Sequence, residues 1–157
     1  MPEAPTSRRA ATAQQPRTAD EASRRAAAVR LLAMDVDGTL TDGRIHIGPQ
    51  GEAMKSFSVR DGFGLTLLRE AGIRLAVITG RRSSIVEYRA AELKFDSVVQ
   101  GVEDKAAVLA RLAAEAGLKP AETGFVGDDW PDLPAMLGAG FAASVADAPA
   151  EVRERAH

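Results

Sequence analysis

The sequence contains no cysteine, which excludes disulfide bonds, thiolate metal sites and a cysteine nucleophile. No apolar run approaches the ~20 residues that a membrane-spanning helix needs. An excess of basic residues is also lacking, since the formal net charge is -2, so we expect no nucleic-acid and no membrane partner. Any catalysis must therefore use oxygen and nitrogen groups, and a bound metal would be a hard ion such as Mg²⁺.

The first 28 residues are rich in Ala, Pro, Thr, Gln and Arg and have no large apolar residue after Met1. Because such a segment buries too little apolar surface to order itself, residues 1–28 are predicted to be a disordered tail, with a short helix near Asp20 to Ala28 as the alternative. The amino terminus lacks the apolar stretch of a secretory signal, so a cytoplasmic protein is expected. Residues 29–157 are long enough for one domain with its own core.

From Val29 onwards, segments typical of strands alternate with segments typical of helices. The expected strands are Val29–Met34, Ile73–Gly80, Ser97–Gly101, Thr123–Asp129 and Gly140–Asp147. The expected helices are Asp61–Gly72, Ser83–Leu93, Glu103–Leu118, Leu133–Gly138 and Pro149–Ala156. This alternation predicts an α/β fold, a parallel sheet with helices on both faces. The turn-rich GPQGE between Arg44–Ile47 and Ala53–Val59 predicts a β-hairpin at about 42–59.

Polar groups follow four of the predicted strands. They are Asp35 and Asp37, then Thr79 to Arg81, then Gly101 to Lys105, then Gly127 to Asp129. Ligands of open α/β sheets bind beyond the carboxyl ends of the strands, so these groups are expected to converge on one ligand. Asp35 and Asp37 are spaced i, i+2 and share one face of an extended chain, where their like charges need a cation between them.

Four motifs, DVDGTLTDG, ITGR, Lys105 and GDDWPD, resemble those of the haloacid dehalogenase (HAD) superfamily of phosphohydrolases. More narrowly, FSVRDGFG, ITGRRSSIVEYRA, QGVEDK and VGDDWPDLPAM resemble the phosphatases of 3-deoxy-D-manno-octulosonate 8-phosphate (KDO 8-phosphate). The resemblance implies a Rossmann-like HAD fold with a small β-hairpin in place of a cap domain. It also implies an Mg²⁺-dependent phosphomonoesterase of lipopolysaccharide biosynthesis and a homotetramer whose hairpins meet at its centre.

The residue chemistry fits this resemblance. Asp35 is the natural nucleophile, because a carboxylate can attack phosphorus in line to give an aspartyl-phosphate. Asp37 can protonate the leaving alcohol and then take a proton from the water that breaks the intermediate. The expected Mg²⁺ ligands are Asp35, the backbone carbonyl of Asp37, and Asp128.

Other residues of the motifs are expected to bind phosphate or to support the site. Thr79 and the amides around Gly80 can hydrogen-bond the phosphoryl oxygens, while Lys105 neutralises charge in the transition state. Asp129 and Asp132 are expected to orient Lys105 or metal-bound water.

Substrate recognition is assigned to the segment after the hairpin and to two arginines. The segment residues expected to face the site are Ser58, Val59, Arg60, Asp61 and Gly62. Arg81 and Arg89 are expected to meet the carboxylate of a sugar acid, because the guanidinium group suits bidentate binding. Two departures from the family pattern are Thr66, where an arginine is common, and the end of the sequence at His157, before a Gly-rich tail. A truncated chain and a different lid are both compatible with the latter.

Two alternative functions stay open. One is a phosphatase for another sugar-acid phosphate, such as a nonulosonate 9-phosphate. The other is a non-catalytic tetramerising module. The presence of Asp37 counts against the module, since a domain kept only for assembly does not need an acid/base.

Overall fold

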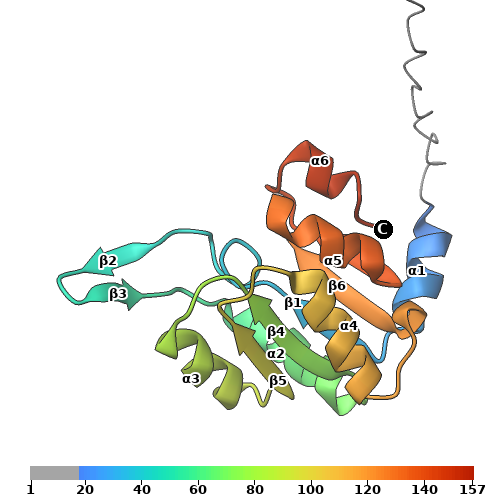
Figure 1. Ribbon diagram of the computed structural model, residues 1–157, viewed down its shortest axis with the longest axis horizontal. Coiled ribbons are helices and arrows are strands. Elements are labelled where there is room, and N and C mark those ends of the chain that lie inside the picture. Colours follow the sequence, from blue (N-terminus) through green and yellow to red (C-terminus); the bar gives the residue numbers. More distant parts are fainter. Residues whose placement is uncertain (1–17) are drawn as a thin grey trace, which may run out of the picture.

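The computed structural model describes residues 18–157, and a five-stranded parallel sheet lies at its centre (Figure 1). The strands are ordered β5-β4-β1-β6-β7. Their bounds are β1 Leu31–Met34, β4 Arg74–Thr79, β5 Ser97–Gln100, β6 Thr123–Gly127 and β7 Phe141–Ser144. All four pairings are parallel, which confirms the predicted α/β fold.

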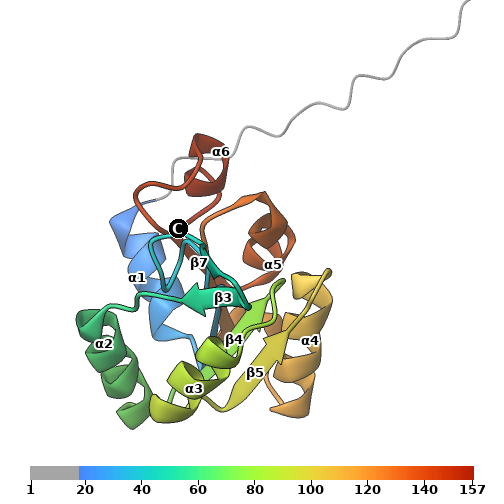
Figure 2. The ribbon, with the colours of Figure 1, turned by 90° about the vertical axis from the view of Figure 1, so that its left-hand side faces the viewer.

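Helices cover both faces of the sheet (Figure 2). Their bounds are α1 Ala19–Ala27, α2 Val59–Glu70, α3 Ser84–Glu92, α4 Lys105–Glu115, α5 Leu133–Gly138 and α6 Ala150–Arg153, with 3₁₀ turns η1 Pro120–Glu122 and η2 Trp130–Asp132. The helices α4 and α5 pack on one face, and α2 and α3 pack on the other. None of the helices in residues 18–157 is long and apolar enough to cross a membrane.

The central strand β1 divides its side chains between the two layers. Leu31 and Ala33 belong to the cluster under α4 and α5, whereas Met34 packs with Leu65 and Leu75 on the opposite face. This division follows from the two-residue period of a strand. Burial on both faces fixes the register of β1 against β4 and β6, and so fixes where Asp35 emerges.

The predicted hairpin is present and projects from the body of the molecule (Figure 1). Its strands β2 (His46–Gly48) and β3 (Gly51–Met54) pair antiparallel and are shorter than expected. The prediction of a strand up to Val59 is wrong, because Val59 is the first residue of α2. Ser58 caps this helix by accepting a hydrogen bond from the Asp61 amide, and this cap ends the extended segment.

The prediction of a disordered tail over residues 1–28 is wrong for its last third, where the alternative helix is found as α1. Thr18 caps α1 through the Glu21 amide, and Arg25 forms an i, i+4 ion pair with Glu21. Arg25 also donates to the carbonyl of Gly140, which precedes β7. These local and long-range bonds order a segment that has no buried side chain of its own. The first part of the expected tail, residues 1–17, lies outside the described residues.

Candidate active site

The strand order brings the ends of β1, β4 and β6 together at the centre of one sheet edge. Asp35 directly follows β1, and its amide donates to the carbonyl of Val126 at 3.0 Å. Thr79 is the last residue of β4 and is buried, while Asp128 follows β6. The sequence-predicted groups therefore converge on this edge.

Three carboxylates gather there, because Asp35, Asp128 and Asp132 each offer an oxygen atom within 4.8 Å of the others. The carboxylate of Asp132 is already occupied. Its Oδ1 accepts from Lys105 Nζ at 2.6 Å, and its Oδ2 accepts from the amides of Asp128 and Asp129 at 3.0 and 3.1 Å. Asp35 and Asp128 are therefore the carboxylates left to bind a cation.

The donor set suits a hard divalent cation. Both groups offer carboxylate oxygens, which Mg²⁺ prefers. Asp35 Oδ1 is buried and lies 2.9 Å from Lys105 Nζ, but it accepts no well-aligned hydrogen bond from the described residues. A buried anionic oxygen with lone pairs to spare is a fitting ligand for a metal ion.

Lys105 places its ammonium group between Asp35 and Asp132. It is the first residue of α4 and is buried, and Asp104 caps this helix by accepting from the Ala107 amide at 2.9 Å. Burial by itself lowers the pKa of Lys105, but the charges of Asp35 and Asp132 outweigh burial and raise that pKa. Lys105 is therefore a fixed cation.

Burial and crowding of like charges act on the two free carboxylates. Burial raises the pKa of Asp35 despite the attraction of Lys105. The pKa of Asp128 is raised to about 6, mainly by burial and further by the charges of Asp35 and Asp132, against the hydrogen bond from Thr39. Two neighbouring carboxylates whose pKa values are both raised favour a bound cation, because the cation offsets their negative charges.

Asp128 is held from the loop that follows β1. Thr39 Oγ1 donates to Asp128 Oδ1 at 2.8 Å. Gly38 adopts a φ of +95°, and a Cβ atom at this position would lie 2.1 Å from Asp128 Oδ2. Gly38 and Thr39 of the first motif thus hold the Asp128 carboxylate in place. This role was not predicted from the sequence.

Asp37 does not belong to the carboxylate cluster, and its side chain contacts Lys55 at the base of the hairpin. Its Oδ1 forms an ion pair with Lys55, and its Oδ2 lies 3.5 Å from Nε of Arg81. Lys55 also pairs with Glu52 at 2.8 Å, and Glu52 accepts from the hydroxyl of Ser83. Lys55 and Glu52 are not among the residues predicted from the sequence, where their signal was the i, i+3 spacing of opposite charges at the second hairpin strand.

The remaining predicted residues of the motifs are Thr79, Gly80, Asp132 and Asp129. Thr79 and the exposed Gly80 lie at the sheet edge beside the cluster. Asp132 contacts Lys105, as expected. Asp129 does not share this contact among the described residues, because its carboxylate accepts from the Trp130 amide at 2.8 Å and caps η2.

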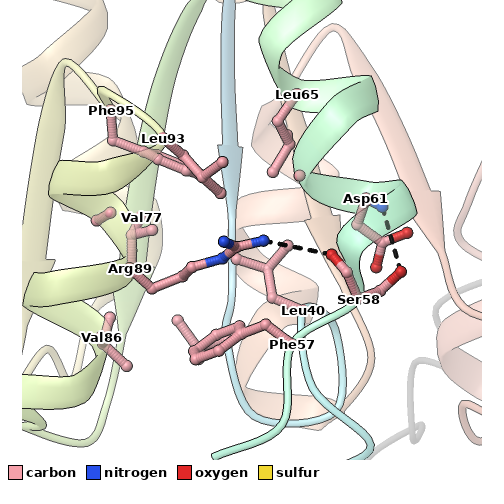
Figure 3. Close-up of a pocket in the computed structure, with 13 residues that line it drawn as sticks. Leu40, Phe57, Ser58, Asp61, Leu65, Val77, Val86, Arg89, Leu93 and Phe95 are labelled. Carbon is pink, nitrogen blue, oxygen red and sulfur yellow. Dashed lines mark hydrogen bonds between the residues drawn. The ribbon is translucent and has the colours of Figure 1, made fainter.

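Four of the predicted substrate residues line an apolar pocket between α2 and α3 (Figure 3). Ser58, Asp61, Gly62 and Arg89 line it, whereas Val59 and Arg60 are exposed at the start of α2. No carboxylate of the metal cluster is among its lining residues.

Arg89 is bound by other residues of the same chain. Its Nη1 pairs with Glu92 at 2.6 Å. Its Nη2 donates to the carbonyl of Ser58 at 3.4 Å, and its guanidinium lies 5.7 Å from the centroid of the Phe57 ring (Figure 3). The guanidinium thus ties α3 to the segment that leaves the hairpin.

The chain is similar to known proteins over most of its length. A family model described as a haloacid dehalogenase-like hydrolase matches residues 52–140. The 3-deoxy-D-manno-octulosonate 8-phosphate phosphatase of Yersinia pestis is 42% identical over 139 residues, which make up 88% of this chain and 74% of that protein.

Solved structures agree with this likeness. One is the 3-deoxy-D-manno-octulosonate 8-phosphate phosphatase from Moraxella catarrhalis in complex with magnesium, phosphate and KDO. It matches with a TM-score of 0.85 at 40% identity over 88% of this chain and 80% of that one. The cobalt-bound enzyme from Haemophilus influenzae matches with a TM-score of 0.81 at 39% identity, over 84% and 77%.

Proposed function

Because this chain belongs to the haloacid dehalogenase-like hydrolase family, we propose that it hydrolyses KDO 8-phosphate to KDO and phosphate. The observation that carries this proposal is that Asp35, Asp128 and Lys105 lie close together at the sheet edge where β1 ends. Asp37 follows Asp35 by two residues. The family resemblance drawn from the motifs is confirmed, and the Yersinia and Moraxella relatives are phosphatases of this sugar acid.

The reaction begins with attack by Asp35 on phosphorus. As the bond between its carboxylate oxygen and phosphorus forms, the bond to the sugar oxygen breaks, and Asp37 gives its proton to that oxygen. Water then attacks the same phosphorus and returns a proton to Asp37, while the bond to Asp35 breaks. Lys105 and Thr79 bind the phosphoryl oxygens, and Lys105 offsets the negative charge.

Mg²⁺ is assigned to Asp35, Asp128 and the backbone carbonyl of Asp37. When bound, it supplies the positive charge that lets two carboxylates approach an anionic phosphate. The raised pKa values of Asp35 and Asp128 support this assignment, since both groups need a cation to stay ionised side by side. Magnesium and cobalt are present in the two related structures.

Substrate contacts are assigned to Arg81 and Arg89, with the segment Ser58 to Gly62 beside them. Arg81 supports this assignment by its place next to Asp37, with its side chain half exposed. Arg89 would have to exchange its contacts with Glu92 and Ser58 for the carboxylate of the substrate. The expected cytoplasmic location stays a prediction.

We also propose a homotetramer built around the hairpin. Apolar side chains are exposed on the hairpin, at Ile45, Ile47 and Met54, and along one face of α2, at Val59, Phe63 and Leu67. Exposed apolar surface of this extent is typical of protein interfaces. A neighbouring subunit that packs on the hairpin would also exclude water from the site, because residues 18–157 contain no inserted cap domain that covers it.

Phosphate release from KDO 8-phosphate with Mg²⁺ tests the proposed function. The wild-type protein is expected to turn over, and Asp35→Asn is expected to lose at least about 10³-fold in kcat, because the amide is a poor nucleophile. Asp20→Asn, the same change on the exposed first turn of α1, is the matched control. Faster turnover of a nonulosonate 9-phosphate would favour that substrate, and wild-type protein inactive on both would favour the assembly module.

A further inference from the structure

Lys55 lies just after β3, where the hairpin returns to the body of the molecule. Its side chain is only 2% exposed, although it stands at the base of a projecting hairpin. A buried ammonium group is tolerated only with charged partners close by. Lys55 has two, Asp37 and Glu52, and their hydrogen bonds raise its pKa against the effect of burial.

Glu52 fixes Lys55 from the hairpin side. Its carboxylate pairs with Lys55 Nζ at 2.8 Å and also accepts from the hydroxyl of Ser83, the residue that caps α3. The hairpin is thus bonded to the loop that follows β4. This network holds the lysine against both elements.

The two oxygens of Asp37 are held unequally. Lys55 is buried and binds Oδ1, whereas Arg81 is 47% exposed and its Nε lies 3.5 Å from Oδ2. An exposed, long contact is weakened by water and salt, so Lys55 is the stronger constraint on the carboxylate. Oδ2 is therefore the less constrained oxygen of this carboxylate.

We propose that Lys55 is a positioning residue for proton transfer by Asp37, and that Glu52 in turn positions Lys55. The inference deepens the proposed phosphatase function and rests on it. A general acid acts only within hydrogen-bond reach of the leaving oxygen, and a free aspartate has several side-chain rotamers. By binding Oδ1, Lys55 selects one of them. The hairpin thereby contributes to the chemical step of its own subunit.

Lys55→Met tests the role, because methionine fills most of the space and removes the ammonium group. Two substrates are compared. KDO 8-phosphate has an alcohol leaving group that needs a proton, whereas para-nitrophenyl phosphate releases a stable phenolate that needs almost none. The comparison uses kcat/KM, which reports the steps up to formation of the aspartyl-phosphate and leaves out the hydrolysis step that both substrates share. We expect kcat/KM for KDO 8-phosphate to fall about 10²-fold, within the range of general acid catalysis. For the aryl phosphate we expect a change below about 5-fold.

Three further variants sharpen the test. Lys119→Met removes an exposed lysine far along the chain and is the matched control. Glu52→Gln keeps its volume and leaves Lys55 charged, so it should give the same substrate difference with a smaller loss even where Lys55→Met does not fold. In an Asp37→Asn background, Lys55→Met should cause little further loss, because the group that it positions is gone.

Three results would overturn the inference. If Lys55→Met lost the same factor of activity on KDO 8-phosphate and on para-nitrophenyl phosphate, the role of Lys55 would be merely structural. Additive losses with Asp37→Asn would show that Lys55 acts elsewhere. Wild-type protein that releases no phosphate from either substrate would overturn the proposed function and this inference together, whereas the first two results would leave the proposed function standing.

Discussion

At position 38 the first motif requires glycine for two separate reasons. The backbone has a φ of +95°, which L side chains rarely adopt, and an added Cβ would lie 2.1 Å from Asp128 Oδ2. We expect Gly38→Ala to displace the Asp128 carboxylate and to weaken Mg²⁺ binding at least about 10-fold, as changes next to metal ligands do. Isothermal titration with Mg²⁺ measures this loss.

Gly72→Ala is the control for backbone strain alone. Gly72 has a φ of +86°, and nothing lies within 4 Å of its added Cβ. This variant should lose about 1 kcal/mol in free energy of unfolding and keep its Mg²⁺ affinity. Equal Mg²⁺ affinity in Gly38→Ala and Gly72→Ala would contradict the role of Gly38.

Mg²⁺ affinity should depend on pH through Asp128. Its pKa of about 6 in the metal-free protein means that protons compete with the metal below this pH, while above it the carboxylate is already ionised. The affinity should therefore be nearly constant from pH 7 to 8 and fall by up to about tenfold per unit below pH 6. Titrations at pH 5, 6 and 7.5 measure it, and equal affinities at pH 5 and 7.5 would contradict the burial of Asp128.

The convergence of the proposed nucleophile and metal-binding carboxylates was predictable from the sequence, because the order of these residues and their positions after strands are local properties. Asp35, Asp128 and Lys105 meet as expected, since parallel strands fix where their ends lie. Lys55 was not predictable in this way. Its partner Asp37 is 18 residues away, and a lysine in a hairpin ordinarily indicates an exposed edge.

At the scale of elements, the cap of α4 places Lys105. Asp104 accepts from the Ala107 amide at 2.9 Å, so Asp104→Ala should lower the free energy of unfolding by about 1 kcal/mol, or the melting temperature by a few degrees. Asp104→Asn should stay close to wild type, since asparagine caps as well as aspartate. Denaturant unfolding compares the two, and equal stability of the alanine and asparagine variants would argue against the cap.

Local sequence patterns did not determine where the helices and strands begin and end. Val59 is β-branched and follows the hairpin, so its local preference indicated a strand, but the Ser58 cap makes it the start of α2. Ala19–Ala27 has too few apolar residues to predict a packed helix. It is ordered through the bond from Arg25 to Gly140, a contact 115 residues apart that no local pattern contains.

At the scale of the whole molecule, the strand order β5-β4-β1-β6-β7 places the ends of β4 and β6 on either side of β1. The three motif segments that carry Asp35, Thr79 and Asp128 are thus neighbours although the chain separates them. The hairpin leaves from the same edge, because it connects β1 to α2. The proposed active site and the proposed interface therefore lie at the same edge of the sheet, which would make a tetramer relevant to catalysis.

Ile47 on the hairpin offers the most direct test of that assembly. Ile47 is 78% exposed, and Ile45 and Met54 on the same hairpin are exposed as well. In a tetramer whose hairpins meet, Ile47→Asp would bury an unpaired charge at each interface, so the assembly should dissociate. Light scattering after size exclusion should show four chain masses for wild type and one for the variant.

Leu137→Asp on α5 is the matched control, since Leu137 is similarly exposed but lies away from the hairpin. It should keep the mass of the wild type. The dissociated Ile47→Asp should also lose phosphatase activity while keeping its folded circular dichroism spectrum, because bulk water in the uncovered site then weakens the electrostatic stabilisation of the transition state. A wild-type protein that elutes with one chain mass at micromolar concentration would exclude the tetramer, and full activity of a monomeric variant would show that the site needs no neighbouring lid.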